Sequence, residues 1–327
     1  MSAGGDDPGV EDTDELVCME VRGGNVPADV ALRAPGLHLH VLSRPYHEAA
    51  GGGDVHYVSS CGTGRITRLM VADVAGHGAD VDAVANTLQT LMRRFVNRID
   101  ARQFVQDMND EFVSVTESGV FATAIVATYF APTGRLSLIN AGHPPPLLFR
   151  AETGQWTIID DAASVGPNNL PLGVLDRTEY ESIEIDLAPG DAVVCYTDSL
   201  PESRDAAGEL LGYDRLLGLA QALTHGQRLG DWLAQWLAAI DAIRPGNLAT
   251  DDLTAVLIRV TAGPTQGHLA ARLAGVGRTL LSPFRPGPTA WPEFDVRNLG
   301  GSVLPFLSRF GRTAPGRDRP KSDAEPG

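Results

Sequence analysis

Carboxylates at the ends of apolar runs are the residues of this sequence best suited to chemistry. They are Asp54, Asp73, Asp198 and the adjacent pair Asp251 and Asp252. Any one of them alone is best interpreted as a strand cap or a solvated turn residue. Together they indicate an ion site, because a carboxylate at the end of a buried run needs water, a partner or a metal. Oxygen ligands of this kind hold Mg²⁺ or Mn²⁺, and the chain offers no cluster of histidines and cysteines that would select zinc.

The elements that position these acids follow from the hydrophobic periodicity. Apolar residues at every second position predict strands, and apolar residues at i, i+3, i+4 and i+7 predict helices. The predicted strands cover residues 37–42, 55–60, 66–74, 121–130, 136–140, 147–150, 156–159, 181–187, 192–197 and 253–260. The predicted helices cover residues 81–95, 104–113, 213–223 and 229–243. Hairpin turns predict antiparallel pairing, and the separation of strand blocks from helix pairs predicts an α+β domain with helices packed on sheets.

Charge and composition divide the chain into a central domain, placed at residues 37–261, and two flanking segments. Residues 1–36 hold 8 acids against 2 arginines, whereas residues 262–327 hold 9 basic residues against 5 acids and are rich in proline and glycine. Both segments are predicted to be mostly flexible. The net charge of -15 argues against a nucleic acid or an anionic membrane as partner. Because neither a spanning apolar run nor a signal peptide is found, a cytoplasmic location is expected.

Six motifs within residues 37–261 carry a resemblance to a known family. They are Gly52-Gly53-Asp54, Val71-Ala72-Asp73-Val74-Ala75-Gly76-His77-Gly78, Asn140-Ala141-Gly142-His143-Pro144-Pro145-Pro146-Leu147, Pro171-Leu172-Gly173-Val174, Pro189-Gly190-Asp191 followed by Tyr196-Thr197-Asp198, and Asp251-Asp252-Leu253-Thr254. In this order they resemble the PPM-type serine/threonine phosphatases of the bacterial SpoIIE/RsbU branch. The resemblance implies a four-layer αββα sandwich, in which two antiparallel sheets are flanked by helices.

The resemblance also implies an activity, which is hydrolysis of phosphoserine or phosphothreonine by a water that two Mn²⁺ or Mg²⁺ ions activate. Asp73 resembles the carboxylate that bridges the two metals, and the main-chain carbonyl of Val74 resembles a ligand of the second. Asp198 and Asp251 resemble further ligands of the first metal, and Asp54 resembles the acid that holds metal-bound water. The residues expected around these ligands are Gly53, Gly76 and Asp252.

Two histidines lie within the motifs. His77, in the glycine-rich turn before the first predicted helix, is either a general acid that protonates the leaving serine oxygen or a residue that packs locally while the glycines let the chain turn. His143 precedes three prolines and is interpreted as a structural residue.

Departures from the family pattern leave an alternative open. Val55-His56-Tyr57 stands where an aromatic pair and a second acid usually follow the first motif, and Ser199 stands where a glycine usually follows Asp198. The chain is therefore either an active phosphatase or a pseudo-phosphatase that binds a partner without turnover.

The expected substrate is implied by the resemblance alone. It is a phosphorylated STAS-domain anti-sigma-factor antagonist in a partner-switching circuit. Since no segment of sensor size precedes residue 37, regulation is expected from a separate protein, from the N-terminal segment or from the basic C-terminal tail.

Overall fold

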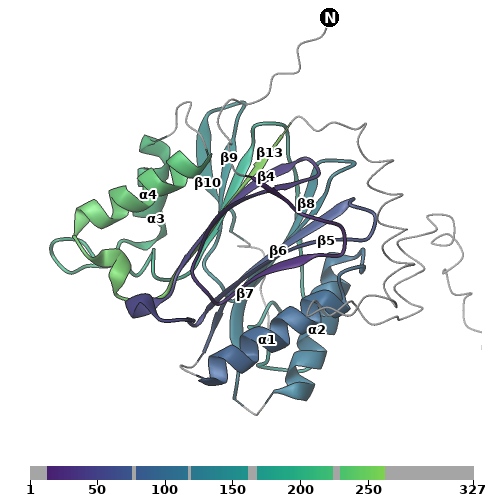
Figure 1. Cartoon of the computed structure of the whole chain (residues 1–327). Helices are drawn as coiled ribbons and strands as arrows, with labels where there is room; N and C mark the ends of the chain where they lie inside the picture. Colours follow the sequence, from purple (N-terminus) through teal and green to yellow (C-terminus); the bar gives the residue numbers. More distant parts are fainter. Residues whose placement is uncertain (1–12, 76–78, 117–118, 161–167, 224–228, 262–327) are drawn as a thin grey trace, which may run out of the picture.

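Two β-sheets packed face to face form the centre of the molecule (Figure 1). The computed structural model describes residues 13–75, 79–116, 119–160, 168–223 and 229–261. The seven-stranded sheet has the order β1 (Asp14–Glu15), β3 (Ala28–Ala34), β4 (Leu37–Arg44), β13 (Leu253–Val260), β12 (Ala192–Tyr196), β9 (Leu147–Arg150) and β10 (Gln155–Ile158). The six-stranded sheet has the order β11 (Ile183–Asp186), β8 (Arg135–Ala141), β7 (Ala122–Phe130), β6 (Ile66–Val74), β5 (Asp54–Ser60) and β2 (Val21–Gly24). Apart from the short parallel pair β1 and β3, the paired strands of the two sheets are antiparallel.

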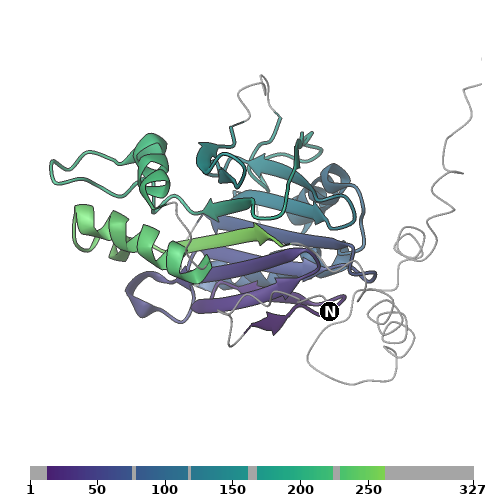
Figure 2. The ribbon, with the colours of Figure 1, turned by 90° about the horizontal axis from the view of Figure 1, so that it is seen from above.

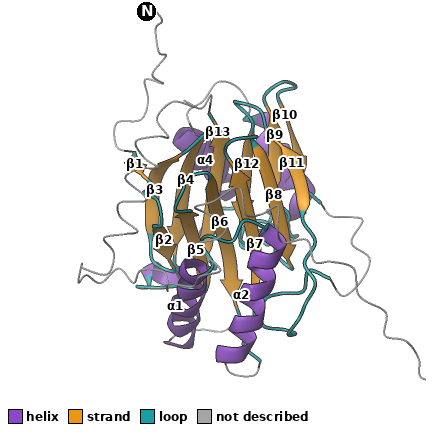
Figure 3. Cartoon of the chain, turned by 90° about the vertical axis from the view of Figure 1, so that its right-hand side faces the viewer, coloured by secondary structure: helices purple, strands orange, loops and turns teal. Residues whose placement is uncertain are grey.

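Helices cover the outer faces of both sheets. Within the described residues, the α-helices are α1 (Ala79–Arg94), α2 (Ala101–Val115), α3 (Gly212–Ala222) and α4 (Leu229–Ile243), and the short 3-10 helices are η1 (Tyr46–Glu48) and η2 (Asn247–Ala249). Helices α1 and α2 lie in front of the six-stranded sheet in Figure 3, with α4 behind the other sheet. In the view from above, the green helices α3 and α4 lie beside the sheet that contains β13 (Figure 2). The predicted four-layer αββα architecture is thus confirmed.

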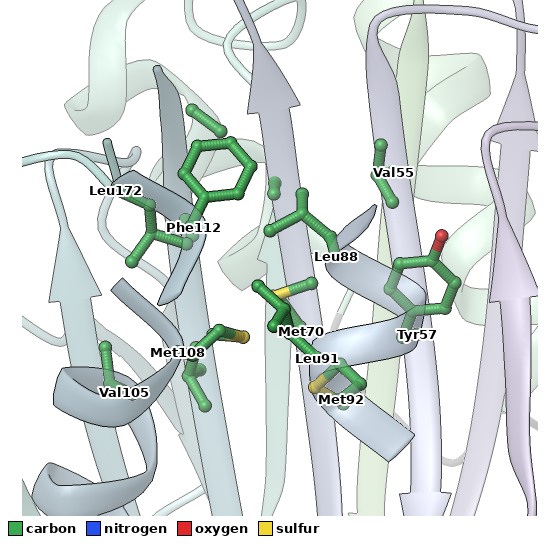
Figure 4. Close-up of a cluster of buried hydrophobic side chains, with 14 of the residues drawn as sticks. Val55, Tyr57, Met70, Leu88, Leu91, Met92, Val105, Met108, Phe112 and Leu172 are labelled. Carbon is green, nitrogen blue, oxygen red and sulfur yellow. The ribbon is translucent and has the colours of Figure 1, made fainter. Parts of the chain in front are cut away.

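The alternation of side chains along the strands builds a separate core on each side of the six-stranded sheet. Val55 and Tyr57 of β5 and Met70 of β6 face α1 and α2, where they pack with Leu88 and other apolar side chains (Figure 4). Residues of the opposite parity fill the space between the sheets; these include Val58, Leu69, Val71, Val193 and Val256. Asp54 and Asp73 share the parity of this second set, because side chains two apart on a strand point to the same face. The fold therefore directs both acids into one end of the space between the sheets.

A third core joins α3 and α4 to the seven-stranded sheet. Trp232 stacks on Trp156 with ring centroids 4.6 Å apart, and Trp236 lies edge-on to Tyr196 at 5.6 Å. Tyr196 ends β12 directly before Thr197 and Asp198. This packing fixes the point at which the chain leaves the sheet toward Asp198.

The N-terminal segment differs from the prediction. Residues up to 36 were expected to be mostly flexible, yet β2 pairs with β5 and β3 pairs along almost the whole of β4. The sequence signal is weak here because β3 alternates its apolar residues with the charged Asp29 and Arg33, and β2 is half glycine. Residues 1–12 and the predicted tail, 262–327, lie outside the described residues. Among the helices of the described part, none has the length and apolar character needed to cross a membrane.

Candidate active site

Asp54 and Asp73 lie side by side at the ends of neighbouring strands. They are direct register partners in the β5–β6 pair, and Asp54 is only 4% exposed. The hydroxyl of Thr197, which follows β12 in the facing sheet, donates a hydrogen bond to Asp54 Oδ2 at 2.7 Å. Burial raises the pKa of Asp54 well above its usual range and the neighbouring Asp73 adds to this, whereas the Thr197 hydrogen bond acts in the opposite direction. The two sheets are thus joined at this carboxylate.

A row of hydroxyl groups on the seven-stranded sheet supports this contact. Thr197 Oγ1 accepts a hydrogen bond from the backbone N–H of Thr254 at 3.0 Å, and Thr254 Oγ1 lies 3.0 Å from Ser43 Oγ. All three residues are buried. The row connects β4, β13 and β12 to Asp54 and fixes the position of its carboxylate.

Asp73 and the carbonyl of Val74 face the same small space beside Gly53. A Cβ atom on Gly53 would lie 3.5 Å from both Asp73 Oδ1 and Val74 O. The Val74 N–H donates to the carbonyl of Gly53 at 3.1 Å, which holds the two segments together. A glycine at this position keeps a side chain away from these two oxygen atoms.

Acids from two further segments reach the same end of the sandwich. Burial, followed by repulsion from the carboxylates of Asp198, Asp251, Asp252 and Glu202, raises the pKa of Asp73 to about 6. Burial, followed by Glu202 and Asp251, also raises the pKa of Asp198. These shifts report that negative charges from β6, the end of β12 and the start of β13 are close enough to interact. The sequence-predicted acids are therefore brought together.

Glu202 is a member of this acidic group that the sequence reasoning missed. It lies in the turn after β12, where its N–H donates to the carbonyl of Asp198 at 2.9 Å, and its side chain is exposed. In the sequence, only its position four residues after Asp198 could have indicated this residue, because Glu202 does not lie at the end of a strand.

Asp252 holds the loop that carries Gly53. Its two carboxylate oxygens accept hydrogen bonds from the backbone N–H groups of Tyr46 and Gly53, both at 2.6 Å. A Cβ on Gly52 would collide with Asp252 Oδ1, so the close approach of this loop needs glycine. Asp251, by contrast, is exposed, and among the described residues it accepts a hydrogen bond from the N–H of Asp252.

The donor set suits a hard divalent cation. It consists of carboxylate and carbonyl oxygens without sulfur or imidazole, as Mg²⁺ and Mn²⁺ prefer. As they stand, no three acidic, histidine or cysteine side chains of the described residues converge to the spacing of a closed ion site. The chemistry of the donors, and the approach of Asp73 Oδ1 and Val74 O to the same point beside Gly53, fit such an ion.

The remaining predicted positions are structural or lie outside the description. Gly76 and His77 fall in the segment 76–78, which is not described. His143 is 5% exposed, its Nδ1 lies 2.9 Å from Thr123 Oγ1, and burial lowers its pKa to about 3. Tyr57 points into the core under α1, where its hydroxyl donates to the carbonyl of Ala85 at 2.6 Å (Figure 4). Ser199 is buried beside Asp198, and its hydroxyl has no hydrogen-bond partner among the described residues.

Comparison with known proteins identifies a matching protein family and several similar proteins. The family model described as Stage II sporulation protein E (SpoIIE) matches residues 63–261. The protein IcfG of Synechocystis sp. PCC 6803 is 28% identical over 148 residues, which are 44% of this chain and 22% of IcfG. The phosphoserine phosphatase RsbP of Bacillus subtilis is 21% identical over 137 residues, which are 40% of this chain and 32% of RsbP. The matched segments thus span about a third or less of these relatives.

Solved structures share the fold. The RsbU and RsbW domains of a Mycobacterium tuberculosis protein superpose with a TM-score of 0.59 at 24% identity, covering 79% of this chain and 72% of that one. The PP2C phosphatase domain of SpoIIE from Bacillus subtilis gives 0.56 at 17% identity, covering 70% and 63%. The catalytic domain of the serine/threonine phosphatase PstP, solved with 2 manganese ions, gives 0.50 at 16% identity, covering 69% and 98%. The layered sandwich described above is the fold of these PP2C phosphatases.

Proposed function

The chain belongs to the SpoIIE family, and we propose that it is a metal-dependent protein phosphatase that hydrolyses phosphoserine or phosphothreonine. The observation that carries this proposal is the meeting of Asp54, Asp73, Asp198 and Asp251, from four separate segments, at one end of the sandwich. An acidic end of this kind would repel a phosphate dianion unless cations compensated its charge. Binding of the substrate therefore depends on divalent ions.

Each residue of the site has a part in this proposal. Asp73, Asp198, Asp251 and the carbonyl oxygen of Val74 would hold two Mn²⁺ or Mg²⁺ ions. When bound, such ions lower the pKa of water and neutralise charge on phosphate oxygens. Asp54 orients the attacking water, and its hydrogen bond from Thr197 favours the ionised carboxylate against the effect of burial. Asp252 keeps the Gly53 loop close to Asp73.

A protein is a better substrate for this site than a small phosphoester. Tyr213 is 41% exposed, and its pKa is raised by burial and then by Asp198 and Glu202, so it lies beside the acidic end. Phe121 is 39% exposed, and its carbonyl accepts from the N–H of Ala75, which directly follows Val74. Exposed aromatic side chains around a phosphate site offer contact area to a folded partner. From the family resemblance we propose a phosphorylated STAS-domain protein as that partner, with a separate protein as regulator.

Hydrolysis of a phosphorylated STAS-domain protein tests this function. With Mn²⁺ present, we expect phosphate release from the phosphoprotein at a far higher kcat/KM than from free phosphoserine. Tyr213→Ala and Phe121→Ala should raise KM for the phosphoprotein and leave the hydrolysis of p-nitrophenyl phosphate unchanged. Equal kcat/KM values for the phosphoprotein and free phosphoserine would contradict the protein substrate while leaving the phosphatase activity itself standing.

The second candidate is a pseudo-phosphatase. It is favoured by the buried Ser199 next to Asp198 and by Tyr57, which occupies the helix-facing core where the family pattern has an acid. The same assay separates the two functions. Tight binding of the phosphoprotein with no release of phosphate at any concentration of Mn²⁺ or Mg²⁺ would establish the binding module and overturn the enzyme.

A further inference from the structure

The turn between β2 and β3 lies beside the glycine loop that leads into Asp54. In this turn the chain passes from the six-stranded sheet to the seven-stranded sheet, and β2 lies against α1 (Figure 3). Asn25 directly follows β2 and is half-buried. It precedes residue 37, where the sequence-predicted domain begins, and it is not one of the acids assigned to the metal ions. Its hydrogen bonds reach two segments around the proposed active site.

Asn25 binds both backbone polar groups of Gly52. The N–H of Gly52 donates to the main-chain carbonyl of Asn25 at 2.9 Å, and the side-chain Nδ2 of Asn25 donates to the carbonyl of Gly52 at 3.2 Å. The same Nδ2 also donates to Asp82 Oδ1, near the start of α1, at 2.7 Å. A Cβ on Gly51 would lie only 2.7 Å from this nitrogen, so the amide group fits here because residue 51 is glycine. One side chain thus joins the glycine loop to the start of α1.

The glycine loop is held from three directions. Besides the contacts of Gly52 with Asn25, the N–H of Gly53 donates to Asp252 Oδ2 at 2.6 Å, and the carbonyl of Gly53 accepts from the N–H of Val74 at 3.1 Å. Glycine has more conformational freedom than any other residue, so a run of three glycines needs such contacts to keep one conformation. Of these three anchors, Asn25 is the one that also binds α1.

Loosening this loop would weaken metal binding without removing any ligand. Gly53 leads directly into Asp54, and a Cβ on Gly53 would lie 3.5 Å from both Asp73 Oδ1 and Val74 O. Helix α1 begins five residues after Val74. If the loop and the start of α1 were no longer joined, the proposed ligands would be correctly arranged for only part of the time. The apparent affinity of a site falls in proportion to the fraction of molecules that are competent to bind.

We propose that Asn25 is a positioning residue of the metal site. Its side-chain amide holds the Gly52–Gly53 loop and the start of α1 in the arrangement that brings Asp54, Asp73 and the carbonyl of Val74 together. The inference rests on the proposed function, because it concerns the same metal ions. Asn25→Ala removes the two side-chain hydrogen bonds and keeps the main-chain one. We expect it to weaken Mn²⁺ binding about tenfold, the order that the loss of one to two net hydrogen bonds supplies.

Asn97 provides a matched control at the other end of β5. It is also half-buried, and its Oδ1 accepts a hydrogen bond from the N–H of Gly62, in the turn between β5 and β6, at 3.1 Å. Calorimetric titration of the full chain with Mn²⁺ should give about tenfold weaker binding for Asn25→Ala and unchanged binding for Asn97→Ala. Phosphate release by Asn25→Ala should recover in excess Mn²⁺, because no ligand has been removed. Equal Mn²⁺ affinities in the two variants would overturn the proposal.

Amide hydrogen exchange in chelator tests the loop without any metal. Exchange of the N–H groups of Gly53 and Val74 should be about tenfold faster in Asn25→Ala than in the unmodified chain, and unchanged in Asn97→Ala. Unchanged exchange in Asn25→Ala would overturn the proposal, and so would faster exchange with an unchanged Mn²⁺ affinity. Failure of the proposed function is distinguishable, because the unmodified chain itself would then bind no Mn²⁺, and the role of Asn25 toward the metal would fall with it.

Discussion

The hydroxyl of Thr197 gives the sharpest expectation, because it connects the two sheets at a single atom. It donates to Asp54 Oδ2 at 2.7 Å and accepts from the backbone N–H of Thr254 at 3.0 Å, and all three residues are buried. Thr197→Val keeps the shape of the side chain and removes both hydrogen bonds. Thr197→Ser keeps the hydroxyl and removes one methyl group.

The expected sizes of the two effects differ. In Thr197→Val the buried N–H of Thr254 is left without a partner, at a cost of about 1–3 kcal/mol, and the bond to Asp54 is lost at a further cost of about 1 kcal/mol. We therefore expect the free energy of unfolding to fall by about 3 kcal/mol. In Thr197→Ser the loss of one buried methyl group costs about 1 kcal/mol. The serine variant should thus be more stable than the valine variant by about 2 kcal/mol.

Urea unfolding of the two variants and the unmodified chain, in the presence of a chelator, measures this difference. Serine must also rescue phosphate release in the metal-loaded protein, because it restores the donor to Asp54. If valine and serine have the same free energy of unfolding and the same rate of phosphate release, the row of hydroxyl groups does not fix Asp54, and this part of the reasoning fails.

Three further expectations concern the acids and glycines around the site. The folded-state pKa of Asp73 is raised to about 6, so protonation of this residue stabilises the folded protein. In chelator, the unmodified chain should therefore gain stability relative to Asp73→Asn as the pH falls from 7 to about 5. If urea unfolding gives a constant difference in the free energy of unfolding between the two chains over this range, the raised pKa is contradicted. Asp252→Ala leaves two backbone N–H groups without an acceptor and should lower the free energy of unfolding by about 2 kcal/mol. Asp251→Ala should lower it by less than about 0.5 kcal/mol but weaken Mn²⁺ binding in calorimetry. Equal losses of stability in the two variants would refute this distinction. Gly52→Ala should destabilise the protein by about 2 kcal/mol, because the new methyl group displaces Asp252. Gly218→Ala, inside α3 with open space around it, should stabilise the protein by about 0.5–1 kcal/mol in thermal unfolding. Stability changes of the same sign in the two variants would be inconsistent with the close approach at Gly52.

Much of the fold was predictable because its signals are local. Strand β6 runs from Ile66 to Val74, as its apolar run predicts, and α4 covers the predicted residues 229–243. The acids at strand ends were predictable for the same reason, since an acid such as Asp73 directly ends an apolar run.

Other features depend on contacts between distant segments and leave little trace in the sequence. The edge strand β2, with its sequence Val-Arg-Gly-Gly, is held by pairing with β5, and no local pattern reveals it. The hydrogen bonds of Asp252 could not be predicted from the sequence, because they join it to the N–H groups of Tyr46 and Gly53 some 200 residues away.

The metal dependence of phosphate release tests the central claim most directly. Release from a phosphoserine protein should be measured with the unmodified chain, with Asp73→Asn, and with Glu152→Gln as an exposed acid at the β9–β10 turn. We expect no release in chelator, release that rises with added Mn²⁺ for the unmodified chain and for Glu152→Gln, and almost none for Asp73→Asn at any Mn²⁺ concentration. Release that persists in chelator, or that survives Asp73→Asn unchanged, would contradict the assignment of the acidic end as a metal-dependent phosphatase site.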